Sequence, residues 1–159
     1  MRTRSKHAVP HLRWLTLACT LLLMFAVGFV AAPSAQAASC YGSSCNGKDA
    51  NAQGCDGASA GGVDLWSPEA RVQLRYSSEC DANWARLVYS GGENCCVNFT
   101  LRAEQQRWNG SAWVAYRKKD KVFTYGATQS NIWTLMNPNE TNDRHRACVV
   151  GEVCTAWIS

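Results

Sequence analysis

Histidine is scarce in this 159-residue sequence: of the three copies, His7 and His11 lie among the first 37 residues and His145 lies beyond them. A single histidine between Arg144 and Arg146 is typical of a surface position on a strand rather than of a general base. The sequence also lacks a Gly-x-Ser-x-Gly turn, a His-Glu-x-x-His motif and a glycine-rich phosphate loop. These absences argue against the enzymes that require such motifs, and we expect no catalytic residue and no cofactor.

Long apolar runs are also missing, except near the start of the chain. Leu21–Ala32 is unbroken but shorter than the roughly 18 residues that a membrane-spanning helix needs. Basic residues precede it and the small-residue stretch Ala35–Ala37 follows it, as in a cleavable secretory signal. We therefore expect residues 1–37 to be a signal peptide and residues 38–159 to form one secreted domain without a stable membrane anchor. A spanning anchor or a lipid on Cys19 is the alternative.

A net charge of one sign is absent from the expected mature chain. The whole sequence has 16 Lys and Arg against 12 Asp and Glu, but four of the basic residues and none of the acidic ones fall within residues 1–37. Without that segment the charges balance, so we expect no nucleic acid as a partner. Residues 117–121 form the one basic cluster, for which we expect a solvated hairpin tip rather than a binding patch.

Cysteine, by contrast, is abundant. Eight cysteines follow residue 37, and an even number in an exported protein is typical of four disulfides. Their spacing lacks the repeated close pairs of a zinc site, and no Cys-x-x-Cys pair is present for redox catalysis. We therefore predict disulfides and no metal. The cysteines are Cys40, Cys45, Cys55, Cys80, Cys95, Cys96, Cys148 and Cys154.

Residues 38–62 are rich in cysteine and glycine and contain almost nothing apolar to bury. Such a segment cannot become ordered by packing into a core, so we predict a loop held by disulfides. Oxygen-bearing side chains alternate along Asp49–Gly54 as at the start of a calcium loop, but Ala60 stands where such a loop needs a bidentate glutamate. A plain, turn-rich loop is the favoured interpretation.

From Ala70 onward, apolar and polar residues alternate as on half-buried strands. Val72, Leu74 and Tyr76 are the clearest case, and residues 97–103 repeat the pattern. Short strands separated by turn residues predict a mostly β fold over residues 63–159, either a compact antiparallel sandwich or a small barrel, preceded by the stapled loop. Further strands are predicted near residues 83–89, 112–117, 121–125, 131–136, 145–150 and 153–158, with a hairpin turn at Asn109-Gly110.

Cys95 and Cys96 are adjacent, and neighbouring residues of a strand point to opposite faces, so a bond between them would strain the peptide. These two cysteines should therefore bond elsewhere. If the first four cysteines pair among themselves, Cys148 and Cys154 are the partners that remain. We prefer bonds to Cys148 and Cys154, in an order that the sequence leaves open. Such bonds would clamp the C-terminal strand to the middle of the sheet.

Several blocks of sequence together form a recognisable pattern. They are Cys40-Tyr41-Gly42-x-x-Cys45-x-Gly47-Lys48-Asp49, Gly54-Cys55, Leu74-Arg75-Tyr76-Ser77-x-x-Cys80-x-x-x-Trp84-Ala85-Arg86, Trp133-Thr134-x-Met136, Arg146-Ala147-Cys148 and Cys154-Thr155-x-Trp157. These blocks resemble the family known as Domain of Unknown Function 2690, which occurs in exported and cell-surface-linked proteins of actinobacteria and other Gram-positive bacteria. The resemblance implies export and a shared fold, but it brings no activity, cofactor or catalytic residue. Ala50 stands where we expect a proline from the family pattern, which implies a less rigid first loop.

Six tryptophans follow residue 37, a large number for a small domain. We assign most of them to the core, which absorbs aromatic rings readily. An exposed aromatic platform near loop ends is the alternative, with arginines on the polar sides of two strands placed to hold an anionic group beside it. The candidate binding surface consists of Trp66, Arg75, Arg86, Trp108 and Trp113.

These features favour a non-catalytic binding or interaction module that acts outside the cell on an envelope glycan or an extracellular protein. A secreted inhibitor or antagonist that presents the bridged Cys40–Cys55 loop is one alternative, because a preorganised loop lowers the ordering cost of binding. A cell-wall glycan hydrolase is another, with a carboxylate pair such as Glu79 and Asp81, or Asp64 and Glu69. Acidic pairs at these spacings occur in any soluble domain, so the hydrolase is the less favoured hypothesis.

Overall fold

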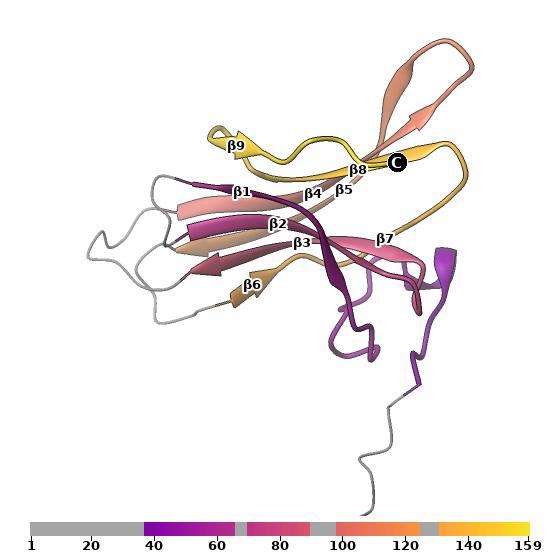
Figure 1. Cartoon of the computed structure of the whole chain (residues 1–159), viewed down its shortest axis with the longest axis horizontal. Helices are drawn as coiled ribbons and strands as arrows, with labels where there is room; N and C mark the ends of the chain where they lie inside the picture. The colour runs from indigo at the N-terminus through magenta and orange to yellow at the C-terminus, as the bar shows by residue number, and fades with distance from the viewer. Residues whose placement is uncertain (1–36, 66–69, 90–97, 125–130) are drawn as a thin grey trace, which may run out of the picture. The chain divides into compact units, whose positions relative to one another are not determined.

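The computed structural model of the chain describes residues 37–65, 70–89, 98–124 and 131–159. All of them belong to one unit of the chain, Gln36–Ser159. They form two antiparallel sheets in a sandwich-like arrangement (Figure 1). The predicted mostly β fold is confirmed, and of the two architectures that the sequence left open the sandwich is the one observed. No helix in the described ranges is long and apolar enough to cross a membrane.

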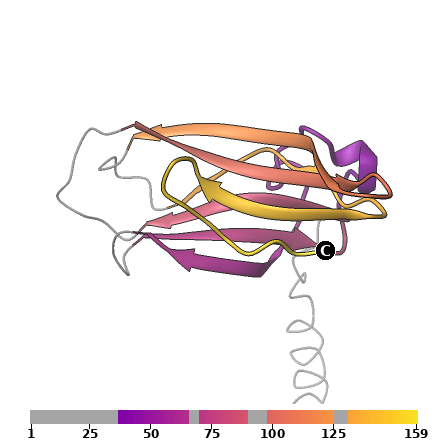
Figure 2. The same ribbon diagram turned by 90° about the horizontal axis from the view of Figure 1, so that it is seen from above.

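The first sheet, sheet A, carries its strands in the order β1-β2-β3-β6, and β7 also pairs with β3. The second, sheet B, has the order β5-β4-β8-β9. Figure 2 shows the two as separate layers. Sheet A contains β1 (Ala58–Asp64), β2 (Ala70–Ser77), β3 (Ala82–Tyr89), β6 (Asn131–Trp133) and β7 (Asn137–Pro138). Sheet B contains β4 (Asn98–Trp108), β5 (Trp113–Thr124), β8 (Asp143–Val149) and β9 (Val153–Cys154), and a short 3-10 helix, η1 (Gly42–Cys45), precedes both sheets.

The main core lies between the inner faces of the two sheets. Because side chains of a strand alternate between faces, the apolar half of each alternating stretch points inward and the polar half outward. Sheet A supplies Val72, Leu74, Ala85, Leu87 and Ile132, and sheet B supplies Leu101, Ala103, Phe123, Ala147 and Val149. The predicted alternation is thus confirmed for Val72 and Leu74 and for the described part of 97–103, whereas Tyr76 is only half-buried.

Strand β5 differs from the prediction of two short strands near residues 112–117 and 121–125. It is a single strand of 12 residues that pairs with β4 along its whole length, and a register shift between Gln105 and Gln106 absorbs one extra residue. The basic cluster of residues 117–121 therefore lies within this strand and not at a hairpin tip. Because β5 is the edge of sheet B, its lysines discourage pairing with a further strand.

Strand β1 begins within the segment that was predicted to be a loop. Residues 58–62 have little to bury, but they add to the edge of β2 through backbone pairing, which requires no apolar side chain. The register shifts between Ser59 and Gly61, and Gly62 leaves room for the side chain of Arg71. The stapled loop therefore ends at Gly57, and the strands begin earlier than predicted.

The predicted turn at Asn109-Gly110 is observed, within a four-residue connection between Trp108 and Trp113. Gly110 adopts a φ of 100°, a left-handed conformation that side-chain-bearing residues avoid. The Asn109 side-chain oxygen accepts bonds from the backbone N–H groups of Ser111 (3.0 Å) and Ala112 (2.8 Å). The turn is thus stabilised by the residue types that predicted it.

The first four cysteines pair among themselves, as predicted, in the bonds Cys40–Cys45 and Cys55–Cys80. The preferred pairing of the C-terminal cysteines is wrong, because Cys148 bonds to Cys154. These two residues are directly opposed across the β8–β9 turn, with a Cα–Cα distance of 4.0 Å, which brings their side chains within bonding reach. Cys95 and Cys96 lie outside the described residues.

Candidate binding pocket

A pocket of about 580 Å³ lies on the outer face of sheet A, beside the N-terminal loop. Its floor follows from strand alternation: Arg75 on β2 pairs with Trp84 on β3, and Arg86, two residues further along β3, pairs with Trp133 on β6. Leu74 and Ala85 point inward, so these four side chains share the opposite, outward face. Three adjacent strands thus place two arginines and two tryptophans together. The lining residues are Asn51, Cys55, Asp56, Gly57, Ala58, Arg75, Trp84, Arg86, Asn131 and Trp133.

The N-terminal loop forms one wall of the pocket, and Gly57 sets how close it approaches the sheet. A Cβ atom at Gly57 would overlap Cη2 of the Trp84 indole and would lie 2.7 Å from its Cζ2. The backbone therefore rests directly on this ring, and Trp84 is only 5% exposed. Glycine at this position is needed because any side chain would push the loop away from the sheet.

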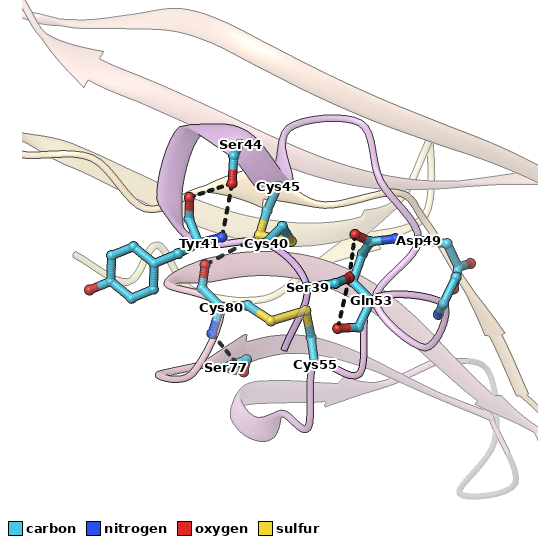
Figure 3. Close-up of a disulfide and its surroundings, with 11 residues drawn as sticks. Ser39, Cys40, Tyr41, Ser44, Cys45, Asp49, Gln53, Cys55, Ser77 and Cys80 are labelled. Carbon is cyan, nitrogen blue, oxygen red and sulfur yellow. Dashed lines mark hydrogen bonds between the residues drawn. A yellow bond between two sulfur atoms is a disulfide. The ribbon is translucent and has the colours of Figure 1, made fainter. Parts of the chain in front are cut away.

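Disulfides and hydrogen bonds hold the loop in place (Figure 3). Cys55–Cys80 ties it to the turn between β2 and β3, and Cys40–Cys45 closes its first part. Backbone bonds of 2.9 Å join Gly47 and Lys48 to Met136 from both sides. The wall is therefore preorganised, so ordering it costs little of the free energy of binding.

The side chain of Asp49 completes this attachment. The indole N–H of Trp133 donates to its Oδ2 at 2.8 Å, and the backbone N–H of Ala52 donates to its Oδ1 at 3.0 Å. Both oxygens of the residue that would open a calcium loop are thus engaged with protein donors. Asp49 acts as a link between the loop and β6.

The four sulfur atoms of the N-terminal disulfides lie within 4.8 Å of one another and are buried. Such a cluster has the size of a tetrathiolate metal site, but metals bind the thiolate form of cysteine. Because all four sulfurs are bonded in Cys40–Cys45 and Cys55–Cys80, none is a thiolate here. The cluster serves to staple the wall of the pocket.

The charge of the pocket is unbalanced. Arg86 donates through Nε (3.1 Å) and Nη2 (2.6 Å) to the side-chain oxygen of Asn131, a neutral acceptor that fixes the guanidinium without cancelling its charge. Arg75 has no hydrogen bond, ion pair or ring contact with any described residue, and its pKa is lowered by burial and by the charge of Arg86. Asp56 is the acidic residue among the described lining. Two guanidinium groups thus face one carboxylate.

The structure brings together only part of the predicted binding surface. Arg75 and Arg86 both line the pocket, whereas Trp108 and Trp113 lie at the hairpin of sheet B, with ring centroids 5.6 Å apart. Trp66 lies outside the described residues. The prediction omitted Trp84 and Trp133, although alternation from Arg86 already put Trp84 on the same face of β3. The sequence carried no signal that β6 would lie next to β3.

A second aromatic and cationic group crosses the outer face of sheet B. Arg144 lies over the rings of Trp113 and Trp157 at 4.5 and 4.7 Å, and Arg146 lies over Trp157 at 4.4 Å. Such contacts contribute roughly 0.5–1 kcal/mol each at exposed sites. The side chain of Gln106 accepts two bonds from Arg144, and Arg146 pairs with Glu104. These arginines are therefore already engaged and form a stabilising stack.

The prediction that His145 is a surface residue is wrong. It lies on the inner face of β8, the same face as the core residues Ala147 and Val149, and its side chain is 3% exposed. Burial lowers its pKa to about 4, and the charge of Arg117 adds to this against the opposing effect of Asp143. Neither ring nitrogen has a hydrogen-bond partner among the residues that the structure describes. Because the ring is buried and neutral, it has no path to a substrate in the pocket of sheet A.

The comparison with family models gives a match over residues 43–148, to the family described as Protein of unknown function (DUF2690). This chain belongs to that family. The matched region includes both pocket arginines, both pocket tryptophans and the loop from Ser43 to Ala58. No curated protein and no solved structure matches the chain. Membership of DUF2690 establishes the resemblance seen in the sequence and assigns no activity.

Proposed function

We propose that this DUF2690 protein acts outside the cell as a non-catalytic binding module, and that the pocket on sheet A is its site for an envelope glycan. The observation that carries the proposal is Arg75, a partly buried guanidinium with no partner among the described residues, in a preorganised pocket beside Trp133. Folded proteins pair such groups unless a ligand uses them. Half-buried tryptophan rings suit the apolar faces of sugar rings.

Two features support a site of action outside the cell. The apolar segment Leu21–Ala32, preceded by basic residues, is typical of a secretory signal. Three disulfides among the described residues are typical of an oxidising compartment. An exported module of this size meets the cell envelope first, which favours an envelope polymer as the ligand.

Binding is favoured over hydrolysis by the lining of the pocket. Glycosidases use two carboxyl groups on either side of the scissile bond, and the described lining offers Asp56 alone. Asp64 belongs to one of the two carboxylate pairs that the sequence offered for catalysis, and it forms a 2.6 Å ion pair with Arg71. Asp81, which belongs to the other pair, accepts hydrogen bonds from the side chains of Tyr76 and Asn139. Each of these carboxylates therefore has a structural role.

Cosedimentation with purified, insoluble cell walls tests this function. The disulfide-bonded protein is expected to pellet with the walls, to stay in solution after the wall glycan has been digested beforehand, and to release no reducing ends. Release of sugar by the pure protein would replace binding with hydrolysis. Failure to pellet with any wall preparation would contradict a glycan ligand.

A second candidate function rests on Tyr41. This side chain is 65% exposed although it lies inside the loop closed by the Cys40–Cys45 bond. A rigid loop with an exposed aromatic tip suits insertion into a pocket of another extracellular protein, as inhibitors do. Inhibition of a secreted protease that is lost in Tyr41→Ala and kept in Arg75→Gln would support this role.

A further inference from the structure

The arginines of the described chain differ in how their charge is balanced. Arg144 is stacked between two tryptophans, and Arg86 is bonded to Asn131. Among the described arginines, Arg75 alone has no hydrogen bond, ion pair or ring contact with a described residue. The arginines that form ion pairs with carboxylates are Arg71, Arg102, Arg107, Arg117 and Arg146.

Arg75 and Arg86 are diagonal neighbours on adjacent strands. Arg75 is opposite Trp84, and Arg86 lies two residues beyond Trp84 on the same face. Diagonal neighbours in an antiparallel pair are roughly 7–8 Å apart at the backbone, which is within reach of two long side chains that converge on one group. Burial and the charge of Arg86 both lower the pKa of Arg75, and neither arginine forms an ion pair with a described residue. A single anion between the two guanidinium groups would relieve this repulsion.

We infer that the pocket recognises an oxyanion, a carboxylate or a phosphate, carried by the sugar that it binds, with Arg75 as the residue that contacts it and Arg86 beside it. This inference rests on the proposed function and names its ligand class. A guanidinium presents planar N–H groups that match two oxygens of one anion. Asn131 already holds the side chain of Arg86 in place. Binding of the anion therefore has to order only the side chain of Arg75, which lowers the entropy cost of binding.

The position of the sugar ring follows from the two tryptophans. Trp84 is covered by Gly57, so its ring is not available. Trp133 pairs with Arg86 across the strands and directs its N–H to Asp49, which leaves the ring face beside the arginines. The ligand therefore places its sugar on Trp133 and its charge on Arg75.

Asp56 is the internal competitor for this site, because it is the carboxylate in the described lining. Its charge opposes an incoming anion and offers Arg75 an alternative partner. Asp56→Asn should therefore tighten the binding of an anionic sugar by about threefold to tenfold, an effect typical of one nearby charge at a solvated site.

The experiment compares three sugars that share one ring: N-acetylglucosamine, N-acetylmuramic acid, which adds a carboxylate, and N-acetylglucosamine 6-phosphate. Their affinities are measured by NMR titration, with the tryptophan indole N–H signals as the readout. We expect at least one of the two anionic sugars to bind more tightly than the neutral one, and added salt to remove the difference. The preferred sugar tells whether a carboxylate or a phosphate is the natural group.

Two variants assign the preference to the pocket. Arg75→Gln should weaken the binding of the anionic sugar by about tenfold to a hundredfold and that of the neutral sugar far less, since charge-assisted bonds are lost. Arg71→Gln, on the same face of β2 but paired with Asp64 outside the pocket, should change neither. Amide spectra that match those of the wild type show that each variant is folded. If Arg75→Gln does not fold, Arg75→Lys replaces it, and we expect a smaller loss of affinity for the anionic sugar.

Equal binding of all three sugars would overturn the oxyanion inference and leave the glycan-binding module intact. Absence of binding for all three, together with failure to pellet with cell walls, would overturn both. An anionic preference that survives in Arg75→Gln would also contradict the inference, because it would place the charge recognition elsewhere.

Discussion

Trp133 donates its indole N–H to the carboxylate of Asp49 across 2.8 Å, although the two residues are 84 positions apart in the chain. This contact joins the N-terminal loop to β6, and it does so at the edge of the pocket. The same side chain that lines the pocket therefore also holds its wall. Stability of the loop and shape of the pocket are linked through one residue.

The substitution Trp133→Phe tests this link, because it keeps an aromatic ring and removes the N–H donor. A bond to a partly exposed carboxylate contributes about 1 kcal/mol, so we expect a loss of that size in the free energy of unfolding. A double-mutant cycle with Asp49→Ala, measured by denaturant unfolding, isolates the pair. Additive effects of the two substitutions would show that the bond contributes nothing.

Gly57 tests the approach of the loop to the sheet. Gly57→Ala places a methyl group against the Trp84 ring, where Cζ2 would be 2.7 Å away, and overpacking of this kind costs roughly 1–3 kcal/mol. Gly61→Ala is the matched control, since its methyl group would lie 3.6 Å from Ile158, an ordinary contact. Thermal unfolding compares the two. Equal stability of both variants would mean that the backbone does not rest on Trp84.

The disulfides are expected to contribute unequally to the free energy of unfolding. Cys55–Cys80 closes a loop with a sequence separation of 25, whereas Cys148–Cys154 has a separation of 6. The chain-entropy model gives about 3.5 kcal/mol for the longer loop and about 2 kcal/mol for the shorter. Paired Cys→Ala variants, unfolded in denaturant, measure both, and only loss of Cys55–Cys80 should also weaken ligand binding. Peptide mapping that finds Cys148 bonded to a different cysteine would contradict the β8–β9 connection.

His145 makes stability depend on pH. Its pKa is lowered to about 4 in the folded chain from an ordinary value of 6.5, so the unfolded chain takes up the proton first as the pH falls. The contribution is complete above pH 6.5 and is lost as the pH falls toward 4, in total about 3 kcal/mol. His145→Leu removes the titrating group and leaves no unpartnered ring nitrogen. As the pH falls from 6.5 to 4, the wild type should lose about 3 kcal/mol more unfolding free energy than the variant. An equal loss in both proteins would show that the ring is already charged or solvated.

The fold was largely readable from alternation. Val72, Leu74 and Leu101 predicted their strands correctly, because one face of each strand is buried and the other is polar. The same rule, applied to His145, Ala147 and Val149, would have placed the histidine inside. The two flanking arginines suggested a surface instead, although flanking residues of a strand point the other way.

The pocket was only half readable. Arg75 and Arg86 were identified as residues on the polar sides of two strands, but Trp133 joins them through the pairing of β6 with β3, which local sequence does not specify. Strand β1 was missed because Gly61 and Gly62 give no alternation, and its pairing uses backbone groups that every sequence has. Long-range pairing is set by the whole core, so a local pattern cannot reveal it.

Arg75 is the residue through which we propose that the pocket of sheet A holds the cell wall. The most direct test is cosedimentation of wild type, Arg75→Gln and Arg71→Gln with the same cell-wall preparation, at one salt concentration. We expect the wild type and Arg71→Gln to pellet equally and Arg75→Gln to stay largely in solution. If both variants pellet like the wild type, the walls are not held through Arg75, the residue on which the proposal rests.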